Sequence, residues 1–400
     1  MLRGRFERLL AHWEGPALRV RYWDGTERIF GVPPAVFTVT IRNPRVLLAL
    51  AARPSLAFGE AYMRGELEVE GDLAQFIGSI PEYARRGVVL PLFSFLVRLV
   101  ALARTISREQ AVRNARHHYD VGNAFYRLWL DPTLTYSCAF FRTSGDDLAT
   151  AQQQKLEYLC RKLHLERGQT LLDIGCGWGS LLFHAVERYG VSATGITPSE
   201  EQCRFVQSEI ERRGLQGRCA VRLLEWRECE GTYDRVVSVG MFEHVGRAHY
   251  RAFLQMWQRL LKRDGVSVLH TIGGMRETPT DPWIRTYIFP GAELPSLGAI
   301  VRSVADANLD IRDVENLRSH YALTLEAWSR AFQEHLRDVV KMYGEAFARM
   351  WWLYLQGTLA GFRSGGLCLW QIILTKDQTV SLPLTREHLF SPFPRPLADS

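Results

Sequence analysis

Paired cysteines are missing from this sequence. Its seven cysteines include no C-x-x-C pair, and none lies with histidines at the spacing of a zinc finger. We therefore expect neither a disulfide framework nor a metal site, and the free thiols indicate a reducing compartment. The cysteines occupy positions 138, 160, 176, 203, 219, 229 and 368.

Long hydrophobic runs are also missing. No apolar run reaches the ~20 residues of a membrane-spanning helix. The charged stretch MLRGRFERLLAHWEG at the start lacks the uninterrupted apolar core of a secretory signal. We find no internal repeat and no low-complexity segment. The formal net charge is only +6, which one local patch can supply, so we expect no nucleic-acid partner. These features predict a cytoplasmic globular protein.

What is present predicts more than one domain. With 400 residues and 47% apolar content, the chain can bury a sizeable core, and two units are the natural expectation. Residues 1–85 mix strand-like alternation around a D-G turn with a later helical stretch, which predicts a small α+β domain. Residues 86–116 form a basic apolar linker, and residues 117–400 form the larger domain.

The linker permits two interpretations. From Tyr83 to Arg116 it combines leucine, phenylalanine and valine with seven arginines and one acid, Glu109. Its apolar side chains can enter the acyl boundary of a membrane while the guanidinium groups meet anionic headgroups. It can also be a helix between two domains with a solvated basic face. Composition alone favours the second interpretation.

The larger domain has the pattern of an α/β fold. Short apolar runs alternate with helical segments, which predicts a doubly wound, mostly parallel sheet with helices on both faces. A helical region rich in aromatic residues covers residues 323–362, and a returning strand follows it. The expected strands lie within residues 169–175, 191–197, 219–225, 234–240, 265–273 and 367–376.

A glycine-rich turn, LLDIGCGWGS, follows the first of these strands. Gly175, Gly177 and Gly179 let the backbone approach a ligand where a Cβ would prevent it. The loop lacks the Lys-Ser/Thr ending of a phosphate-binding loop, and Trp178 occupies the room that a pyrophosphate needs. Asp173 places a carboxylate where a ligand ammonium can lie. We therefore favour S-adenosylmethionine over NAD.

The next two strand ends supply the other expected cofactor contacts. A dinucleotide fold often has a ribose-binding acid at the end of its second strand, but Thr197 stands there, so Gln202 or Glu200 must substitute. After the third strand, Glu225 can accept from an adenine amino group and Trp226 can stack on the base. Spacing alone allows equally that these two residues form a solvated turn.

Six ordered motifs resemble one known family. Together they are similar to cyclopropane-fatty-acyl-phospholipid synthases and, more distantly, to mycolic acid cyclopropane synthases, over most of residues 117–375. The N-terminal part also resembles that family's extra domain. The motifs are residues 117–141, 171–180, 237–246, 269–273, 281–296 and 320–328.

The resemblance implies an enzyme with a seven-stranded methyltransferase-type sheet. It would transfer a methylene group from S-adenosylmethionine to a cis double bond of a phospholipid acyl chain, with bound bicarbonate as base. The bicarbonate site would consist of Cys138 (through its backbone amide), Glu243, His270, Tyr321 and the backbone around Ile272. Cofactor contacts would fall on Tyr136, Ser137, Gly175, Gly177, Thr197, Gln202 and Trp226.

The chemistry accounts for these residue types but leaves alternatives open. A dry pocket must align the sulfonium methyl with a weakly nucleophilic alkene, and aromatic faces can stabilise the cationic chain that results. Glu243 can hold a small anion if it is protonated. Without the resemblance, His270 is more often structural, Cys138 is more often an inert apolar residue, and Tyr321 equally suits a capping or core role. Some family members have a late cysteine where Thr358 stands here.

Three functions therefore compete. The first is cyclopropanation; the second stops at a methyl- or methylene-branched acyl chain; the third is a non-catalytic lipid-binding protein. With the resemblance, the linker favours peripheral contact with the anionic inner face of the membrane, and a homodimer is also implied.

Overall fold

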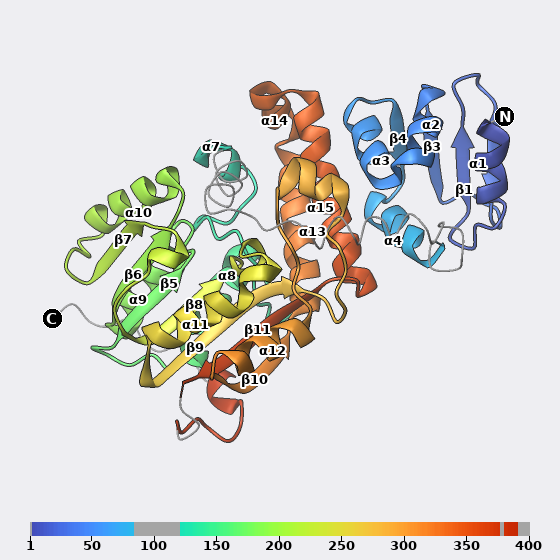
Figure 1. Ribbon diagram of the computed structural model, residues 1–400. Coiled ribbons are helices and arrows are strands. Elements are labelled where there is room, and N and C mark those ends of the chain that lie inside the picture. Colours follow the sequence, from blue (N-terminus) through green and yellow to red (C-terminus); the bar gives the residue numbers. More distant parts are fainter. Residues whose placement is uncertain (1, 84–120, 377–379, 391–400) are drawn as a thin grey trace. The chain divides into compact units, whose positions relative to one another are not determined.

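A computed structural model describes residues 2–83, 121–376 and 380–390 (Figure 1). The chain divides into two compact units. Unit 1 contains Met1–Arg104, Pro279–Ile288 and Trp328–Gly366, and unit 2 contains Thr105–Thr278, Phe289–Ala327 and Leu367–Ser400. The predicted linker, residues 86–116, lies outside the described residues.

Unit 1 contains a four-stranded sheet and several helices. The strand order is β2-β1-β3-β4, and β1 is parallel to β3. Asp24 and Gly25 form the turn between β1 and β2, as the D-G pair predicts, and Gly25 has a φ of 78°. The elements are α1 (Leu2–Leu10), β1 (Leu18–Arg21), β2 (Glu27–Phe30), β3 (Phe37–Ile41), α2 (Arg45–Ala52), α3 (Pro54–Met63), β4 (Leu67–Glu70), α4 (Leu73–Tyr83), the π-helix η5 (Ile284–Ile288), α14 (Leu336–Tyr343) and α15 (Glu345–Ser364).

Unit 2 is built on a seven-stranded sheet. Its order is β10-β11-β9-β8-β5-β6-β7; β11 runs antiparallel to both neighbours, and the other neighbouring pairs are parallel. The strands are β5 (Thr170–Ile174), β6 (Ser192–Thr197), β7 (Cys219–Leu223), β8 (Tyr233–Val239), β9 (Leu261–Gly273), β10 (Asp310–Asn316) and β11 (Cys368–Thr375). The helices are α7 (Asn123–Tyr126), α8 (Leu148–Lys162), α9 (Ser180–Tyr189), α10 (Glu200–Arg212), α11 (Tyr250–Leu260), α12 (Leu297–Asp306) and, reaching into unit 1, α13 (Arg318–Glu334), with short turns η2 (Trp226–Glu228), η3 (Phe242–His244), η4 (Arg247–His249) and η6 (Glu387–Phe390).

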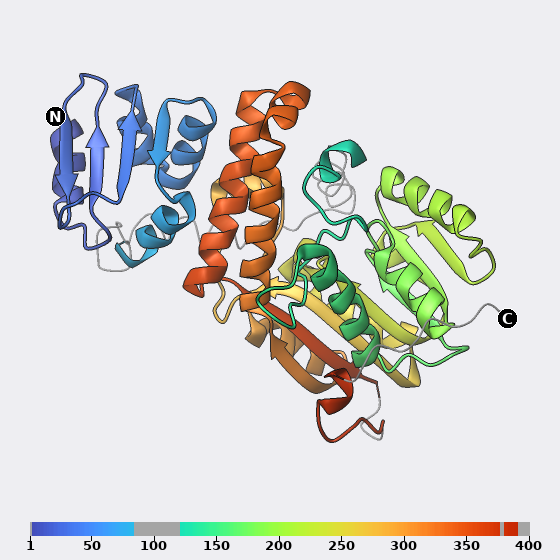
Figure 2. The same ribbon diagram turned by 180° about the vertical axis from the view of Figure 1, so that it is seen from behind.

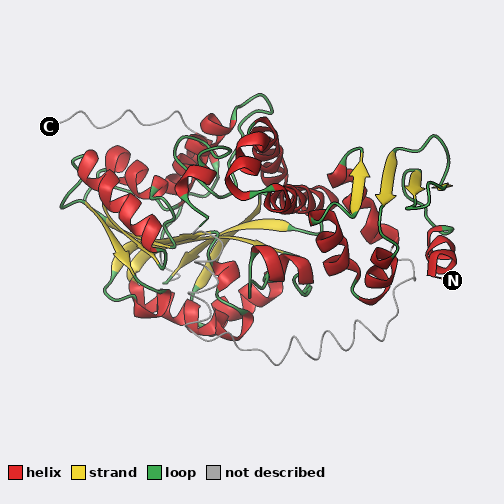
Figure 3. Ribbon diagram, turned by 90° about the horizontal axis from the view of Figure 1, so that it is seen from above, coloured by secondary structure: helices red, strands yellow, loops and turns green. Residues whose placement is uncertain are grey.

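Helices cover both faces of this sheet. One core cluster joins alternate sheet residues to α11 and α12, and a second joins the other sheet residues to α8, α9 and α10. Figures 1 and 2 view the two faces from opposite sides, and Figure 3 shows the strands between two helical layers. The expected fold, a doubly wound and mostly parallel seven-stranded sheet with a smaller α+β unit, is confirmed.

Strand β10 was not located from the sequence. Its residues, DIRDVEN, are mostly charged and half-buried, so no apolar run marks it. The strand forms because β11 offers an edge with which it pairs from Asp310 to Asn316. Among the described residues, no helix has the length and apolar character needed to cross a membrane.

Candidate active site

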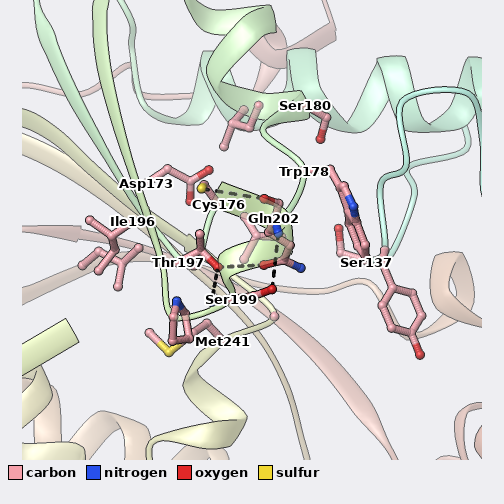
Figure 4. Close-up of a pocket in the computed structure, with 18 of the residues that line it drawn as sticks. Ser137, Asp173, Cys176, Trp178, Ser180, Ile196, Thr197, Ser199, Gln202 and Met241 are labelled. Atoms are coloured by element: carbon pink, nitrogen blue, oxygen red, sulfur yellow. Dashed lines mark hydrogen bonds between the residues drawn. The ribbon is translucent and has the colours of Figure 1, made fainter. Parts of the chain in front are cut away.

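A pocket lies at the carboxyl ends of the parallel strands in unit 2. It encloses about 1130 Å³ of empty space, part of it open to solvent. The loops after β5, β6, β7 and β8 line it, together with residues 134–137 and one residue of α8 (Figure 4). This edge of an open α/β sheet is where ligands bind. The nine residues predicted to contact the cofactor all line it: Tyr136, Ser137, Asp173, Gly175, Gly177, Thr197, Gln202, Glu225 and Trp226.

The glycine turn needs its glycines for two reasons. Gly175 has a φ of 88°, and a Cβ there would lie 2.8 Å from the side chain of Met241, so both conformation and space exclude a larger residue. Gly177 has a φ of 56° and open space where a Cβ would lie. The turn therefore brings backbone to the surface of the pocket with no side chain in front of it.

A buried carboxylate and a buried lysine face the pocket together. Asp173 is 2% exposed, and its Oδ1 has no hydrogen-bond partner among the described residues. Desolvation raises the pKa of Asp173 to about 7, against the opposing effect of Lys155. Desolvation also lowers the pKa of Lys155 to about 8, and its Nζ donates to Ser137 Oγ at 2.9 Å. An unpaired buried oxygen suits a ligand ammonium, which would supply the missing donor.

Thr197 holds the side chain of Gln202, one of the two residues expected to substitute for a ribose-binding acid. Thr197 Oγ1 donates to Gln202 Oε1 at 2.7 Å, which orients the amide of Gln202 (Figure 4). Its nitrogen is then the group left to donate to a ligand hydroxyl. Ser199 caps the following helix, α10, because its side chain accepts a hydrogen bond from the backbone N–H of Gln202.

Hydrogen bonds hold the turn after β7, and two of its residues are buried. Glu225 is 7% exposed and caps η2 in a reciprocal capping box with Glu228. Its two oxygens accept from Arg227, one from the side chain at 2.6 Å and one from the backbone at 2.9 Å. The guanidinium of Arg227 lies 4.1 Å from the ring centroid of the buried Trp226. Glu225 therefore holds the turn and reaches the pocket only with its remaining lone pairs.

Cys138 lies in a buried segment beside α13. Its Sγ donates to Ala139 O at 3.2 Å, and burial strongly raises the pKa of the thiol. The amide of Ala139 donates to Thr324 Oγ1, which fixes the segment against the helix. No hydrogen bond to the Cys138 amide forms within the described part of the chain. The thiol is therefore not activated as a nucleophile, and the backbone amide is the available donor.

Glu243 is held by the backbone of β9. It is 4% exposed, and its Oε1 accepts from the Ile272 amide at 2.5 Å. Its Oε2 is buried and has no hydrogen-bond partner among the residues described. Desolvation raises the pKa of Glu243 to about 7, against the hydrogen bond from Ile272. Ile272 thus positions the carboxyl group, and Oε2 can carry a proton at neutral pH.

His270 lies two residues before Ile272 on the same face of β9, and Tyr321 lies on helix α13. His270 is the last residue of β9 paired with β8, opposite Val239, which lines the pocket. Tyr321 is buried in the first turn of α13, and its amide donates to the carbonyl of Leu317, whose own amide donates to Leu369 O on β11. Glu243, His270 and Ile272 therefore come together at one end of β9, and Tyr321 is on the helix that starts beside β11.

The raised pKa of Glu243 predicts a pH-dependent stability difference. The neutral acid is favoured in the fold, so the contribution of this group to stability is full below pH 4.5 and is lost as the pH rises through about 7. The difference of about 2.5 pKa units corresponds to about 3 kcal/mol. As the pH rises from 5 to 8, we expect the free energy of unfolding of Glu243→Gln to increase by up to that amount relative to that of the parent protein. Urea unfolding of the variant and the parent protein at pH 5 and at pH 8 measures this change. A stability difference between the two proteins that is the same at both pH values would contradict the burial of a neutral acid.

Several pocket residues were not identified from the sequence. Among them are Lys155, Met241 and His244. Lys155 had a usable signal, because it lies between Ala151 and Leu159 on the apolar stripe of α8, where a lysine is out of place. Met241 and His244 follow β8 in a turn without a distinctive spacing, and only the fold brings them to the pocket.

Comparisons with known proteins agree with this geometry. The family model described as mycolic acid cyclopropane synthetase matches residues 106–372, and a domain family of unknown function matches residues 5–87. The chain belongs to the mycolic acid cyclopropane synthetase family. As a family member it is an S-adenosylmethionine-dependent C-methyltransferase, as predicted.

Individual relatives of this family member cover most of its length. It is 36% identical to the "Probable fatty acid methyltransferase" of Pseudomonas putida, over 93% of this chain and 96% of the relative. It is 35% identical to the "Cyclopropane-fatty-acyl-phospholipid synthase" of Escherichia coli, over 90% and 92%. The solved structure of mycolic acid cyclopropane synthase CmaA1 complexed with SAH and CTAB has 36% identity and a TM-score of 0.63, and the match covers 66% of this chain and 97% of that one.

Proposed function

We propose that this enzyme transfers a methylene group from S-adenosylmethionine to the cis double bond of unsaturated phospholipid acyl chains and forms a cyclopropane ring. The observation that carries the proposal is the extent of the match to the Escherichia coli relative. That similarity includes unit 1 as well as unit 2, whereas the match to the mycolic acid enzyme covers only two thirds of this chain. The simplest explanation of a match that includes both units is that this chain and the Escherichia coli relative act on the same substrate.

The pocket residues support binding of the cofactor. S-adenosylmethionine supplies an activated methyl group on a sulfonium. Asp173 offers its unpaired oxygen to the ammonium, Gln202 offers its amide nitrogen to a ribose hydroxyl, and Trp226 offers a ring to the base. The glycine turn lets the backbone approach without a side chain. These groups orient the donor and keep water away from it.

We propose that a bicarbonate anion takes up the proton lost from the new methyl group. Three groups of this chain suit an anion: the backbone amide of Cys138, the protonated Oε2 of Glu243, which has no partner among the described residues, and the ring of His270. Burial lowers the pKa of His270 well below its ordinary value, so the ring is neutral. A neutral acid and a neutral ring leave the site free of a fixed negative charge that would repel the anion.

We also propose that the enzyme works at the inner face of the membrane. The support is compositional: the arginine-rich apolar segment before Arg116 combines acyl-compatible side chains with positive charge. An enzyme that acts on chains inside a bilayer must reach anionic headgroups first.

A second candidate product is a methyl- or methylene-branched acyl chain. The relative from Pseudomonas putida, whose printed name is a fatty acid methyltransferase, is as similar as the Escherichia coli synthase and covers as much of this chain. Both products begin with methyl transfer to the alkene. The ring forms when the new methyl group loses a proton and closes on the cationic carbon, and a methyl-branched alkene forms when a chain carbon loses the proton instead. A methylene branch forms when a hydride first shifts along the chain and the methyl group then loses its proton.

Lipid analysis tests the proposal directly. We expect expression in a host without cyclopropane lipids to give phospholipids heavier by one CH2 that no longer react as alkenes. Mass spectrometry after hydrogenation and after ozonolysis separates the outcomes. Retained unsaturation with the same mass gain would support the branched product, and Glu243→Gln provides the inactive control. An unchanged lipid profile with a folded protein that binds S-adenosylmethionine would contradict the substrate assignment.

A further inference from the structure

A row of polar side chains crosses the sheet of unit 2 at the end of β9. Glu315 on β10 is the direct partner of Gln371 on β11, and Gln371 is the direct partner of His270 on β9. Directly opposite residues on neighbouring strands point to the same face of a sheet. The neighbouring residues on that face, Val268 on β9 and Ile373 on β11, belong to the apolar core beneath α8 and α9. Polar groups in such a place need partners that satisfy them.

Lys162 supplies these partners from the end of α8. Its side chain is fully buried, and its Nζ donates to Gln371 Oε1 at 2.8 Å and to Glu315 Oε2 at 2.5 Å. Tyr158 also donates to the carboxylate of Glu315. Gln371 Nε2 lies 3.0 Å from His270 Nδ1. Gln371 and His270 are 0% and 1% exposed, so this part of the row is shielded from water, whereas the side chain of Glu315 is 18% exposed.

The directions of these hydrogen bonds follow from the chemistry of the ammonium. An ammonium group donates only, so the amide oxygen of Gln371 must face Lys162. The amide nitrogen then faces the imidazole and donates to Nδ1. A neutral imidazole that accepts at Nδ1 carries its hydrogen on Nε2. The reverse orientation of the amide would set its NH2 group against the ammonium, with two donors facing each other.

The hydrogen bond of the His270 ring to a described residue is made through Nδ1, and Oε2 of Glu243 has no hydrogen-bond partner within the described ranges. His270 and Ile272 lie on the same face of β9, and the amide of Ile272 holds Glu243. The ring of His270 and the carboxyl group of Glu243 therefore have hydrogen-bonding capacity left over from their contacts with the described residues.

We propose that Lys162 and Gln371 are positioning residues that fix His270 as the Nε2–H tautomer, so that the ring presents a hydrogen-bond donor to the anion of the reaction. The identity of that anion as bicarbonate rests on the proposed function, whereas the tautomer does not. The other tautomer would present a lone pair at Nε2 to an anionic oxygen. Glu315 and Tyr158 serve this arrangement indirectly, because they hold the ammonium in place.

The test reads the tautomer directly. We expect ¹⁵N–¹H correlation spectra of the full-length protein, labelled in its histidine rings, to show a bare Nδ1 and a protonated Nε2 for His270. Loss of the signals in His270→Asn assigns them among the eleven histidines. Gln371→Glu places an acceptor against Nδ1 and should add a proton there. Lys162→Met frees the amide to turn and should give a mixture of tautomers. A protonated Nδ1 in the parent protein, or spectra unchanged in both folded variants, would overturn the proposal.

Kinetics supply the second readout. We expect Gln371→Glu to raise the KM for added bicarbonate about tenfold or more, with the KM for S-adenosylmethionine unchanged. Gln356→Glu is the matched control, because Gln356 is also buried but donates to Ser329 on the helices of unit 1. An equal rise in both constants for Gln371→Glu would overturn the positioning role. If the parent enzyme ignores bicarbonate, the proposed base is wrong, and the spectra still decide the tautomer.

Discussion

Replacement of Glu243 by glutamine is expected to lower kcat by about 10²- to 10³-fold and to leave the affinity for S-adenosylmethionine unchanged. The glutamine oxygen can keep the hydrogen bond from the Ile272 amide, so the side chain stays in place. In place of the titratable Oε2, whose proton is proposed to hold the anion, the variant has an amide NH2 group that donates but can neither release nor take up a proton. Single-turnover rates and calorimetry separate the two effects.

Glu243→Asp and Glu277→Gln are the companions of this variant. The aspartate keeps a titratable carboxyl group but withdraws it by one methylene, so we expect an intermediate rate. Glu277 is exposed and pairs with Arg247 on the surface, and its replacement should leave the rate unchanged. If Glu243→Gln weakened cofactor binding and left the rate per bound cofactor intact, the carboxyl group would belong to the cofactor site.

Replacement of Asp173 by asparagine should weaken S-adenosylmethionine binding by about 10- to 100-fold at pH 8. The carboxylate is buried and its Oδ1 has no donor among the described residues, so the ligand ammonium is the group that would satisfy it. Because the pKa of Asp173 is raised to about 7, affinity in the parent protein should increase as the pH rises through 7. The variant should lose this dependence. Calorimetry between pH 6 and pH 8 measures both effects.

A ligand without an amino acid part provides the control for Asp173. Methylthioadenosine keeps the nucleoside and the sulfur but has no ammonium. Its affinity should be the same for the parent protein and Asp173→Asn. Equal losses for the two ligands would mean that Asp173 maintains the shape of the glycine turn and does not contact the ammonium.

Local sequence was sufficient where one short segment carries both the element and its function. The apolar run before Gly175 predicts β5, and the glycines after it predict the close approach of the backbone to a ligand, because both properties depend on neighbouring residues. Seven of the nine expected cofactor contacts lie along one pocket for the same reason: they lie at or after the ends of β5, β6 and β7, and parallel strands end at one edge. Tyr136 and Ser137 lie outside these strand ends and were expected from the family resemblance alone.

Local sequence was insufficient where the role of a residue depends on how the strands pair and which helix covers them. Lys162 and Gln371 are far apart in the chain and have no motif, and they meet because β11 pairs with β9 and α8 covers that face. Glu225 shows the same limit, since its capping role depends on the turn that follows β7. The assignment of the anion site to Cys138, Glu243, His270, Ile272 and Tyr321 stays a prediction from the family resemblance.

The placement of β11 has a consequence for how this enzyme is made. It is the last of the seven strands along the chain, yet it lies between β9 and β10. Until a growing chain supplies it, β9 has an unpaired edge, β10 has no partner, and the imidazole of His270 has nothing to select its protonation pattern. Nascent chains therefore pass through a stage in which strand edges are unpaired and the tautomer of His270 is not fixed. Unpaired edges at this stage favour aggregation and binding by chaperones.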